Sequence, residues 1–496
     1  MPEHFDRRRF LLLAGSGAAL SLAGCGRGTD SAQTPAASSA AASASGNVAA
    51  GGAPELKGDA LLVDLQQRTF RFFWQTTESR YGLAPDRYPT PSFASIAAIG
   101  FALTAYVIGV ERNWITRDEA RERVLATLSF LRDAPQGPEP TGRSGYRGFF
   151  YHFLHLTTGE RYAACELSTI DTALLMAGVR CCGQYFTGND DAEARIRRLA
   201  DELIGRVEWT WAQPRAPLIN LAWSPEKGFS GYDWRGYNEA MLIYLMALGS
   251  PTHPVGTDAW EAWTSGYARS WASLEGIEHL TFGPLFGHQY THVWVDFRGM
   301  PDAYLRERNS DYFINSQRAV QSQRAYAIRN PLGWQGYGKN CWGLTACDGP
   351  YDGALPYNGG SRMFRTYAAR GVGPIENYDD GTLAPTAAAA SIAFAPDLVL
   401  PMLEHLYSHY GSALLGPYGF LDAFNPSFHF DDVLPAKGRR VGELGWVDND
   451  YLGIDQGPIL AMIENYRSGL IWRTMQNDPI IRKGLQRAGF SGGWLA

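Results

Sequence analysis

The stretch Gly228-Phe-Ser-Gly-Tyr-Asp-Trp-Arg-Gly-Tyr-Asn-Glu239 runs directly into the apolar segment Met241-Leu-Ile-Tyr-Leu-Met-Ala-Leu248. Its first half is rich in glycine and aromatic residues, which indicates an ordered loop, and its second half has the composition of a buried helix. A helix over Tyr237–Leu248 would place Glu239 on the face that carries Leu242, Ile243 and Met246. We therefore expect an inward-facing acidic residue at the start of a core helix.

Helical periodicity continues from this segment in both directions along the chain. Capping-box patterns over Thr116–Glu119 and Ser168–Asp171, and first-turn prolines at Pro458 and Pro479, support several helix starts. The other expected helices are Leu61–Thr77, Ser95–Arg112, Arg117–Arg132, Thr169–Phe186, Asp191–Glu208, Asp258–Trp271, Ser310–Ile328, Thr386–Phe394, Asp397–Tyr410, Pro458–Trp472 and Pro479–Ala488.

Twelve helices with alternately short and long links predict six helical hairpins, which can close into an all-α (α/α)6 barrel. The long links concentrate glycine and aromatic residues, and we expect them to form small β-hairpins and to wall a pocket. A helical repeat array would also fit twelve helices, but the chain has no motif of fixed period. No linker-like composition divides residues 56–496, so we expect one domain there. The long links are Ala134–Leu167, Val207–Gly236, Ala272–Asn309, Asn330–Pro385 and Gly411–Gly457.

The first 55 residues have the composition of an export signal and a tether rather than of a fold. Residues 1–25 join the arginine run Arg7–Arg9 to an apolar segment, Leu12–Leu22, that is too short to span a membrane permanently. This pattern is typical of a twin-arginine signal, and the ending Leu22-Ala-Gly-Cys25 resembles a lipobox. We expect lipidation of Cys25, a flexible tether over 26–55, and a protein anchored by its lipid at the periplasmic side or the cell surface. Ordinary signal cleavage is the alternative.

The overall composition excludes several other classes of protein. The net charge of −6 comes from 44 basic and 50 acidic side chains without a long run of either sign, which argues against nucleic acid or an anionic membrane surface as a partner. No phosphate-binding loop, dinucleotide fingerprint or usable serine-nucleophile motif is present, so we expect no cofactor. Cysteine spacing predicts no zinc site, although Cys341 and Cys347 could form a local disulfide. We expect a monomer.

Glu239 is the first candidate for catalysis. A carboxyl group held among apolar and aromatic side chains tends to keep its proton, as a general acid that protonates a glycosidic oxygen must. The alternative is a glutamate in a first helical turn that is favoured there by the helix dipole.

Three aspartates are candidates for the base that activates water. Asp455 is predicted just outside a helix, where it either caps free N–H groups or acts as a base or a ligand of sugar hydroxyls. Asp171 has a sufficient explanation as part of the capping box. Asp422 lies in the aromatic loop Tyr418–Asn425 and has no capping role.

The segment Phe286-Gly-His-Gln-Tyr-Thr-His-Val-Trp294 holds two histidines at helical spacing. His288 and His292 could share a metal ion on a helix, but glycine and aromatic neighbours indicate a loop, and we favour hydrogen bonds to substrate or structure. The following Trp294-Val-Asp296-Phe-Arg298 pairs opposite charges among aromatic residues, either as a salt bridge in the wall or as a subsite.

Aromatic loop residues are the expected platforms for sugar rings, because C–H faces of sugars stack on aromatic rings. Each residue alone is more typical of a core, but as a group beside glycine and asparagine they exceed what a core needs. The predicted substrate contacts outside the histidine segment are Tyr232, Trp234, Arg235, Tyr237, Trp334, Trp342 and Gln456.

The motifs over Trp209–Trp472 resemble the bacterial glucoamylase-like domain, and the chain from Leu61 onward is similar to glycoside hydrolase family 144. The resemblance rests on Gly231–Glu239, Leu248-Gly-Ser-Pro-Thr-His-Pro254, Phe286–Trp294, Ile454-Asp-Gln-Gly-Pro458 and Glu464-Asn-Tyr-Arg-Ser-Gly-Leu-Ile-Trp472.

This resemblance implies an (α/α)6 barrel that hydrolyses β-1,2-glucan with inversion and without a metal, by endo action or by release of sophorose. It also implies Glu239 as the acid and leaves the base open among Asp171, Asp422 and Asp455. Another glucosidase or a transglycosylase on the same barrel remains an alternative, as does a glycan-binding lipoprotein without catalysis.

Overall fold

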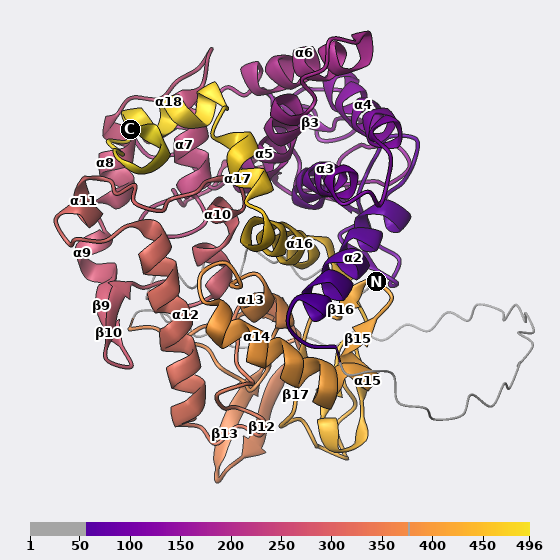
Figure 1. Cartoon of the computed structure of the whole chain (residues 1–496), viewed down its shortest axis with the longest axis vertical. Helices are drawn as coiled ribbons and strands as arrows, with labels where there is room; N and C mark the ends of the chain where they lie inside the picture. Colours follow the sequence, from indigo (N-terminus) through magenta and orange to yellow (C-terminus); the bar gives the residue numbers. More distant parts are fainter. Residues whose placement is uncertain (1–55, 375–376) are drawn as a thin grey trace, which may run out of the picture.

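The computed structural model describes residues 56–374 and 377–496. An inner and an outer layer of helices form its body, and the chain crosses between the layers repeatedly (Figure 1). Most of the inner helices contact one another around the ring. The inner layer consists of α3 (Ile96–Glu111), α5 (Thr169–Tyr185), α7 (Met241–Gly249), α10 (Tyr290–Trp294), α13 (Pro385–Ala389) and α16 (Gly453–Arg467). The outer layer consists of α2 (Gly58–Thr76), α4 (Arg117–Asp133), α6 (Asp191–Gly205), α12 (Tyr312–Arg329), α14 (Pro396–His405) and α18 (Pro479–Arg487). The predicted all-α (α/α)6 barrel is confirmed.

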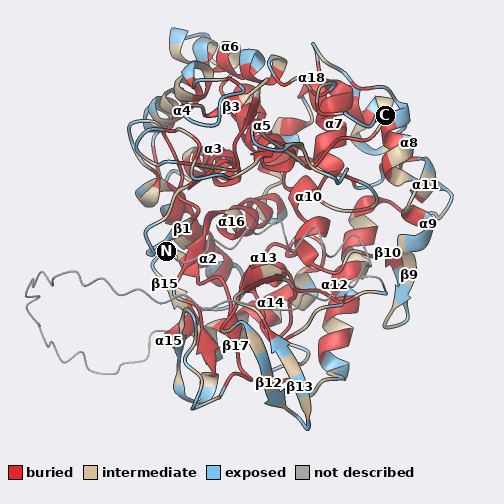
Figure 2. Cartoon of the chain, turned by 180° about the vertical axis from the view of Figure 1, so that it is seen from behind, coloured by how far each residue is buried: buried red, intermediate tan, exposed pale blue. Residues whose placement is uncertain are grey.

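The division into layers follows the pattern of apolar residues. Nearly all of α3 and α5 is buried: α3 is apolar on every side, and the buried Arg180 of α5 is paired with Asp201 and Asp478, whereas α6 and α18 bury one stripe only. Figure 2 shows this contrast between the red inner helices and the mixed colours of α6. Gly100 on α3 and Gly178 on α5 face each other's backbones so closely that a Cβ at either position would meet backbone atoms of the other helix. The two helices can therefore pack in direct backbone contact.

Shorter helices fill the connections between the layers. They are α8 (Asp258–Thr264), α9 (Tyr267–Ser270), α11 (Ala303–Arg306), α15 (Gly411–Leu414) and α17 (Leu470–Met475), together with a π-helical turn at Leu406–Tyr410 and 3-10 turns at Leu285–His288, Gly442–Leu444 and Gly493–Leu495.

The long links contain small antiparallel strand pairs, as predicted. They join β1 to β20, β2 to β5, β3 to β4, β9 to β10, β11 to β14, β12 to β13 and β15 to β16, with three-stranded sheets β6-β7-β8 and β17-β19-β18. The strands are β1 (Arg87–Tyr88), β2 (Ala94–Ser95), β3 (Gly145–Tyr146), β4 (Phe149–Phe150), β5 (Phe153–Leu154), β6 (Leu167–Ser168), β7 (Ala222–Ser224), β8 (Gly228–Phe229), β9 (Trp271–Leu274), β10 (Ile277–Leu280), β11 (Ala346–Asp348), β12 (Gly353–Tyr357), β13 (Gly360–Phe364), β14 (Tyr367–Ala369), β15 (Leu415–Gly416), β16 (Gly419–Phe420), β17 (Phe424–Asn425), β18 (Arg439–Arg440), β19 (Trp446–Val447) and β20 (Tyr451–Leu452).

Three local predictions were wrong. The histidine segment was expected to be a loop, but it forms a 3-10 turn followed by α10, because almost every residue over 285–295 is buried and its backbone needs internal partners. Pro458 was expected in a first turn, yet α16 begins five residues earlier at Gly453. The helix expected over Tyr237–Leu248 begins only at Met241, so Glu239 lies in the turn before it.

The signal, the tether and the lipidated Cys25 that we predict for residues 1–55 lie outside the described residues. Among the residues that the structure describes, no helix is both long and apolar enough to cross a bilayer. Cys341 and Cys347, which could have formed a disulfide, are free thiols. Cys341 packs in the main core, whereas Cys347 belongs to a second apolar cluster around Trp334 and Phe364.

Candidate active site

A pocket lies at the end of the barrel where the inner helices α5, α7 and α16 begin. It holds about 540 Å³ of empty space, including the part that is open to solvent. Three of the four predicted catalytic residues, Asp171, Glu239 and Asp455, line it together, although they are as much as 284 residues apart in the sequence. The complete lining is His152, Ile170, Asp171, Leu174, Glu239, Phe286, Tyr290, Ala346, Tyr367, Ile454 and Asp455.

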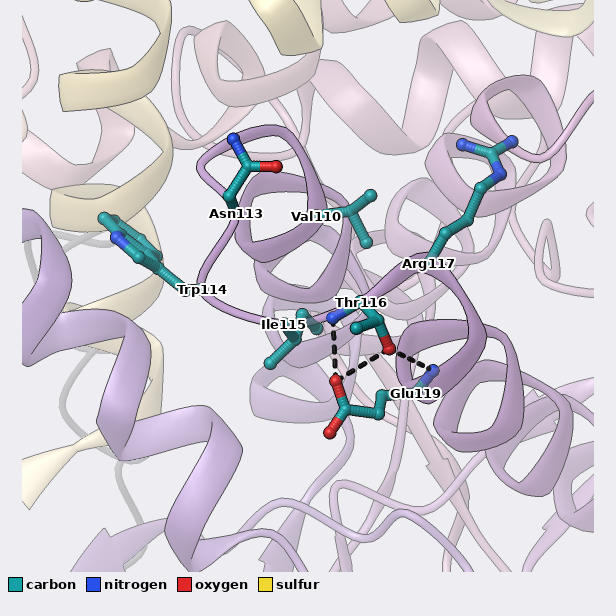
Figure 3. A pocket seen from close by; sticks show the side chains of 7 residues that line it. All are labelled: Val110, Asn113, Trp114, Ile115, Thr116, Arg117 and Glu119. Carbon is teal, nitrogen blue, oxygen red and sulfur yellow. Dashed lines mark hydrogen bonds between the residues drawn. The ribbon is translucent and has the colours of Figure 1, made fainter.

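A second hollow, with about 640 Å³ of empty space by the same measure, lies where α3 ends and α4 begins (Figure 3). It contains the capping box of α4, in which the Thr116 hydroxyl accepts from the Glu119 amide and the Glu119 carboxylate accepts from the Thr116 amide. Arg117 at its edge is ion-paired with Glu193 on α6. None of the predicted site residues lines this hollow, and its polar groups serve the helix start.

Glu239 is placed by the glycine-rich loop that precedes α7. The Asn220 side chain donates to the carbonyl oxygens of Ser230 and Tyr232, at 3.0 and 2.8 Å, and so holds the loop against the β7 region. The Tyr244 hydroxyl on α7 donates to the Trp234 carbonyl at 2.9 Å. These bonds hold the segment from Ser230 to Trp234 in place ahead of Glu239. The Glu239 residue is 4% exposed.

Asp171 lies in the first turn of α5, where the capping box was expected. The Ser168 hydroxyl caps the helix by accepting from the Asp171 amide at 3.0 Å, and it also donates to the Asp171 carboxylate. On its other side, Nε2 of His152 lies 3.6 Å from Asp171 Oδ2, while Nδ1 of His152 lies 3.0 Å from Glu166 Oε1. The Ser168 cap is compatible with the catalytic prediction, because Asp171 still lines the pocket.

Asp455 belongs to the first turn of α16 rather than to the loop before it. The pairing of β1 with β20 delivers the chain to Leu452, the N-cap of α16. Pro458 then lies inside the helix, where its missing N–H leaves the Ile454 carbonyl without a helical donor at the edge of the pocket. The prediction placed the helix start too late because a first-turn proline is the commoner arrangement.

Asp422 does not line the pocket. It lies between β16 and β17, where its Oδ2 accepts from the Asp348 amide at 2.7 Å and its own amide donates to the Asp450 carbonyl at 2.8 Å. The structure therefore separates Asp422 from the other three acidic candidates.

The two predicted histidines are structural. The ring nitrogens of His288 lie 3.1 Å from the Tyr237 hydroxyl and 3.2 Å from the Phe282 carbonyl, so both are engaged inside the protein. Burial lowers the pKa of His292 to about 3, and its Nε2 lies 3.2 Å from the Ser316 hydroxyl. A metal shared between them is excluded by the partners of His288.

Most of the predicted aromatic platforms also lie in the core. The indole N–H groups of Trp234, Trp294 and Trp334 donate to Thr169, Thr104 and Asp379, respectively. Tyr237, Trp342 and Gln456 are buried as well, whereas Tyr232 and Arg235 are exposed on the loop before α7. None of these eight residues lines the pocket.

The pair Asp296–Arg298 is a salt bridge, as one of the two interpretations expected. Arg298 Nη2 lies 2.7 Å from Asp296 Oδ2, and its guanidinium lies over the Trp472 ring at 4.6 Å from the centroid. Neither residue is part of the pocket lining, so the wall interpretation fits better than the subsite.

Sequence reasoning missed His152 and Tyr367 and did not single out Phe286 or Tyr290. Phe286 and Tyr290 belong to the histidine segment, where the helical spacing of an aromatic pair was a usable signal. His152 and Tyr367 stand in long links, and only the folding of those links over the barrel brings them to the pocket.

The comparisons with known proteins agree with this architecture. Residues 231–479 match a family model named Glycoamylase and described as "putative glucoamylase". A "putative glucoamylase" structure from Bacteroides uniformis is 31% identical, covers 90% of this chain and all of its own, and superposes with a TM-score of 0.76. The endo-β-1,2-glucanase of Chitinophaga pinensis, solved with sophorotriose and glucose, is 28% identical over 89% of this chain and 100% of its own, with a TM-score of 0.75.

A curated relative is the exo β-1,2-glucooligosaccharide sophorohydrolase of Parabacteroides distasonis, which is 30% identical over 462 residues. The match covers 86% of this chain but only 58% of that relative.

The family match covers half of the chain and includes Glu239 and Asp455, and the Bacteroides uniformis structure aligns along its whole length. The resemblance predicted from the motifs is thereby confirmed, and the chain belongs to the glucoamylase-like family.

Proposed function

We propose that this protein is a glycoside hydrolase that cleaves β-1,2-glucan, either by endo action or by releasing sophorose. The observation that carries the proposal is the pocket in which Asp171, Glu239 and Asp455 meet beside aromatic side chains. The sophorohydrolase and the endo-β-1,2-glucanase among the relatives support the choice of linkage.

The three carboxyl groups can divide the work of an inverting hydrolysis. Glu239 donates its proton to the glycosidic oxygen as the bond to the anomeric carbon breaks, and a water molecule attacks that carbon from the opposite face. An aspartate takes the proton of the water. Asp171 and Asp455 both stand in the first turn of a helix, where the helix dipole favours the negative charge that a base needs. Asp422 is not proposed for this role, because it lies outside the pocket.

Aromatic side chains complete the pocket for a sugar. Phe286, Tyr290 and Tyr367 come from three different parts of the chain and line the same cavity. Their ring faces suit the C–H faces of glucose, and the tyrosine hydroxyls can bond with sugar hydroxyls.

Product analysis on linear β-1,2-glucan is the direct test, with starch and laminarin as comparison substrates. We expect either a ladder of short oligosaccharides or sophorose alone from β-1,2-glucan, and no products from the other two. Release of glucose from starch would overturn the linkage. Intact binding without products from any glucan would instead favour a glycan-binding protein that does not catalyse.

Export and anchoring of the protein are part of the same proposal. The arginine run, the short apolar segment and the ending at Cys25 support a lipoprotein that meets glucan outside the cytoplasm. Membrane fractionation of the wild type and of a Cys25→Ser variant tests the anchor. The wild type should sediment with membranes and the variant should not; equal distribution would contradict lipidation.

A further inference from the structure

A cluster of buried aspartates lies behind the pocket, outside the proposed catalytic machinery. Asp348 ends β11, Asp422 stands between β16 and β17, and Asp448 follows β19. All three side chains are at most 2% exposed. One oxygen atom from each carboxylate lies within 4.8 Å of one oxygen of each of the others. The chain therefore brings three acidic groups from distant loops to one point.

Two salt bridges to basic side chains converge on one member of the cluster, Asp348. Arg87 Nη1 lies 2.7 Å and Lys437 Nζ 2.5 Å from the same oxygen, Oδ2 of Asp348. Arg87 also contacts Asp86 at 3.3 Å and Asp450 at 3.5 Å. Arg87 and Lys437 thus form salt bridges within a group of five buried aspartates, the three of the cluster together with Asp86 and Asp450. Without another positive charge, this arrangement would hold like charges together in the protein interior.

Asp448 is an observation independent of the clustering. It is fully buried, its Oδ1 accepts from the Asn449 amide at 2.8 Å, and its Oδ2 has no hydrogen-bond partner. No basic side chain of the described residues forms a salt bridge with it. A buried carboxylate oxygen without a donor is costly unless something positive meets it.

The ligand atoms that the cluster offers indicate which kind of cation it could bind. Carboxylate oxygens without histidine or cysteine are the ligands of hard cations. Ca²⁺ binds oxygens at about 2.4 Å in flexible geometry, whereas Mg²⁺ demands a near-ideal octahedron and usually keeps several waters. Three carboxylate oxygens within 4.8 Å of one another are compatible with ligands of one Ca²⁺ ion.

We propose that Asp348, Asp422 and Asp448 form a structural calcium site that ties together three loops behind the pocket. Asp348 is paired in register with Tyr367 across β11 and β14, and Ala346 on the same strand lines the pocket with Tyr367. A bound ion would therefore hold the strand pair that supplies this wall. The site has a structural role and takes no part in the proposed proton transfers.

The test uses the full chain, depleted with EDTA and then dialysed into buffer with or without CaCl₂. Elemental analysis after dialysis against low calcium should find about one Ca²⁺ per chain. Adding Ca²⁺ to a hundred times its dissociation constant should raise the thermal unfolding midpoint by about 3 °C for a domain of this size. The same concentration of MgCl₂ should raise it much less.

An Asp448→Asn variant separates binding from folding. Loss of one negative charge removes repulsion in the ion-free protein, so the variant in EDTA should unfold at the temperature of the wild type or higher. Its response to Ca²⁺ should disappear or require at least tenfold more of the ion. Asp432→Asn, at an exposed aspartate of the loop between β17 and β18, is the matched control and should keep the wild-type response.

Two results would overturn the calcium site. One is a wild-type midpoint that is the same in EDTA and in CaCl₂ together with less than a tenth of an ion per chain, which would mean that the carboxyl groups hold a proton instead. The other is an equal rise with MgCl₂, which would contradict the assignment to calcium. Neither result bears on glucan cleavage, which product analysis tests separately.

Discussion

At the scale of single residues, the acidic candidates differ in what the chain around them does. Glu239 comes from a turn, and Asp171 and Asp455 come from first helical turns, yet all three reach one pocket. Their residue types and their positions near helix starts could be recognised in the sequence. His152 could not, because its link to Asp171 and Glu166 exists only after the loops fold.

Replacement of Glu239 tests the proton donor. Glu239→Gln keeps the size of the side chain but removes the proton, so kcat on β-1,2-glucan should fall by about 10²- to 10⁴-fold while oligosaccharide binding remains. Initial rates and calorimetric titration with a β-1,2-linked oligosaccharide measure the two effects. Glu278→Gln, on the exposed side of β10, is the matched control and should leave kcat unchanged. Activity of Glu239→Gln close to that of the wild type would refute the assignment.

At the scale of elements, helix starts serve both the fold and the site. Ser168 caps α5 and donates to the carboxylate of Asp171, whereas Thr116 caps α4 far from the pocket. The same type of helix cap therefore contacts a proposed catalytic residue at α5 and none at α4. The sequence showed both caps, and only the placement of α5 in the inner layer distinguishes them.

Removal of the two caps should separate these consequences. Ser168→Ala and Thr116→Ala should each lower the free energy of unfolding by about 1 kcal/mol, since each removes a side-chain acceptor from a helix start. Ser168→Ala should also reduce kcat, because the Asp171 carboxylate loses a donor, and Thr116→Ala should not. Urea unfolding and initial rates on the same preparations provide the comparison. Equal effects of both variants on kcat would show that Ser168 does not position Asp171.

The histidines of β10 and α10 make the stability depend on pH. Burial lowers the pKa of His279 to about 4 and that of His292 to about 3, below the unfolded value of about 6.5. The unfolded chain therefore binds more protons than the folded one in this range. Stability should be fully present above pH 6.5 and should fall as the pH drops toward 4, by up to about 1.4 kcal/mol per pH unit for each histidine.

Urea unfolding at pH 7 and pH 5 measures this loss. His279→Gln should lose less stability than the wild type between the two values, because one buried imidazole no longer has to be kept neutral. His155→Gln, at an exposed histidine, should behave like the wild type. An unchanged pH dependence in His279→Gln would contradict the role of its burial.

At the scale of the whole molecule, the barrel closes where its first helix meets its last inner helix. Glu464 on α16 accepts from Gln66 on α2 at 2.7 Å and from two nitrogens of Arg112 after α3, each at 2.7 Å. Arg467, three residues further along α16, contacts Gln66 and Asp59, because ring closure brings α2 against α16.

Glu464→Gln should therefore weaken the closure of the ring. Glu464 is 1% exposed and its loss leaves Arg112 without its carboxylate, so the free energy of unfolding should fall by about 3 kcal/mol. Glu139→Gln is the matched control: it removes the exposed i,i+4 partner of Arg143 and should change stability by less than about 0.5 kcal/mol. Equal losses of stability in the two variants would show that the contact between Glu464 and Arg112 contributes no more to the free energy of unfolding than an exposed ion pair.

Most of the helical segments, the loops rich in glycine and aromatic residues, and the three acidic residues of the pocket could be predicted from the sequence. Apolar periodicity and helix caps are local properties, so they can be recognised without knowledge of the fold. The tertiary structure decided the rest. It made a helix of 290–294, because buried backbone needs internal hydrogen bonds, and it turned Trp234, Trp294 and Trp334 into core residues rather than sugar platforms. It also brought Glu464 to Arg112 and gathered Asp348, Asp422 and Asp448, since contacts between residues so far apart in the chain depend on the closure of the barrel and on the loops folded over it.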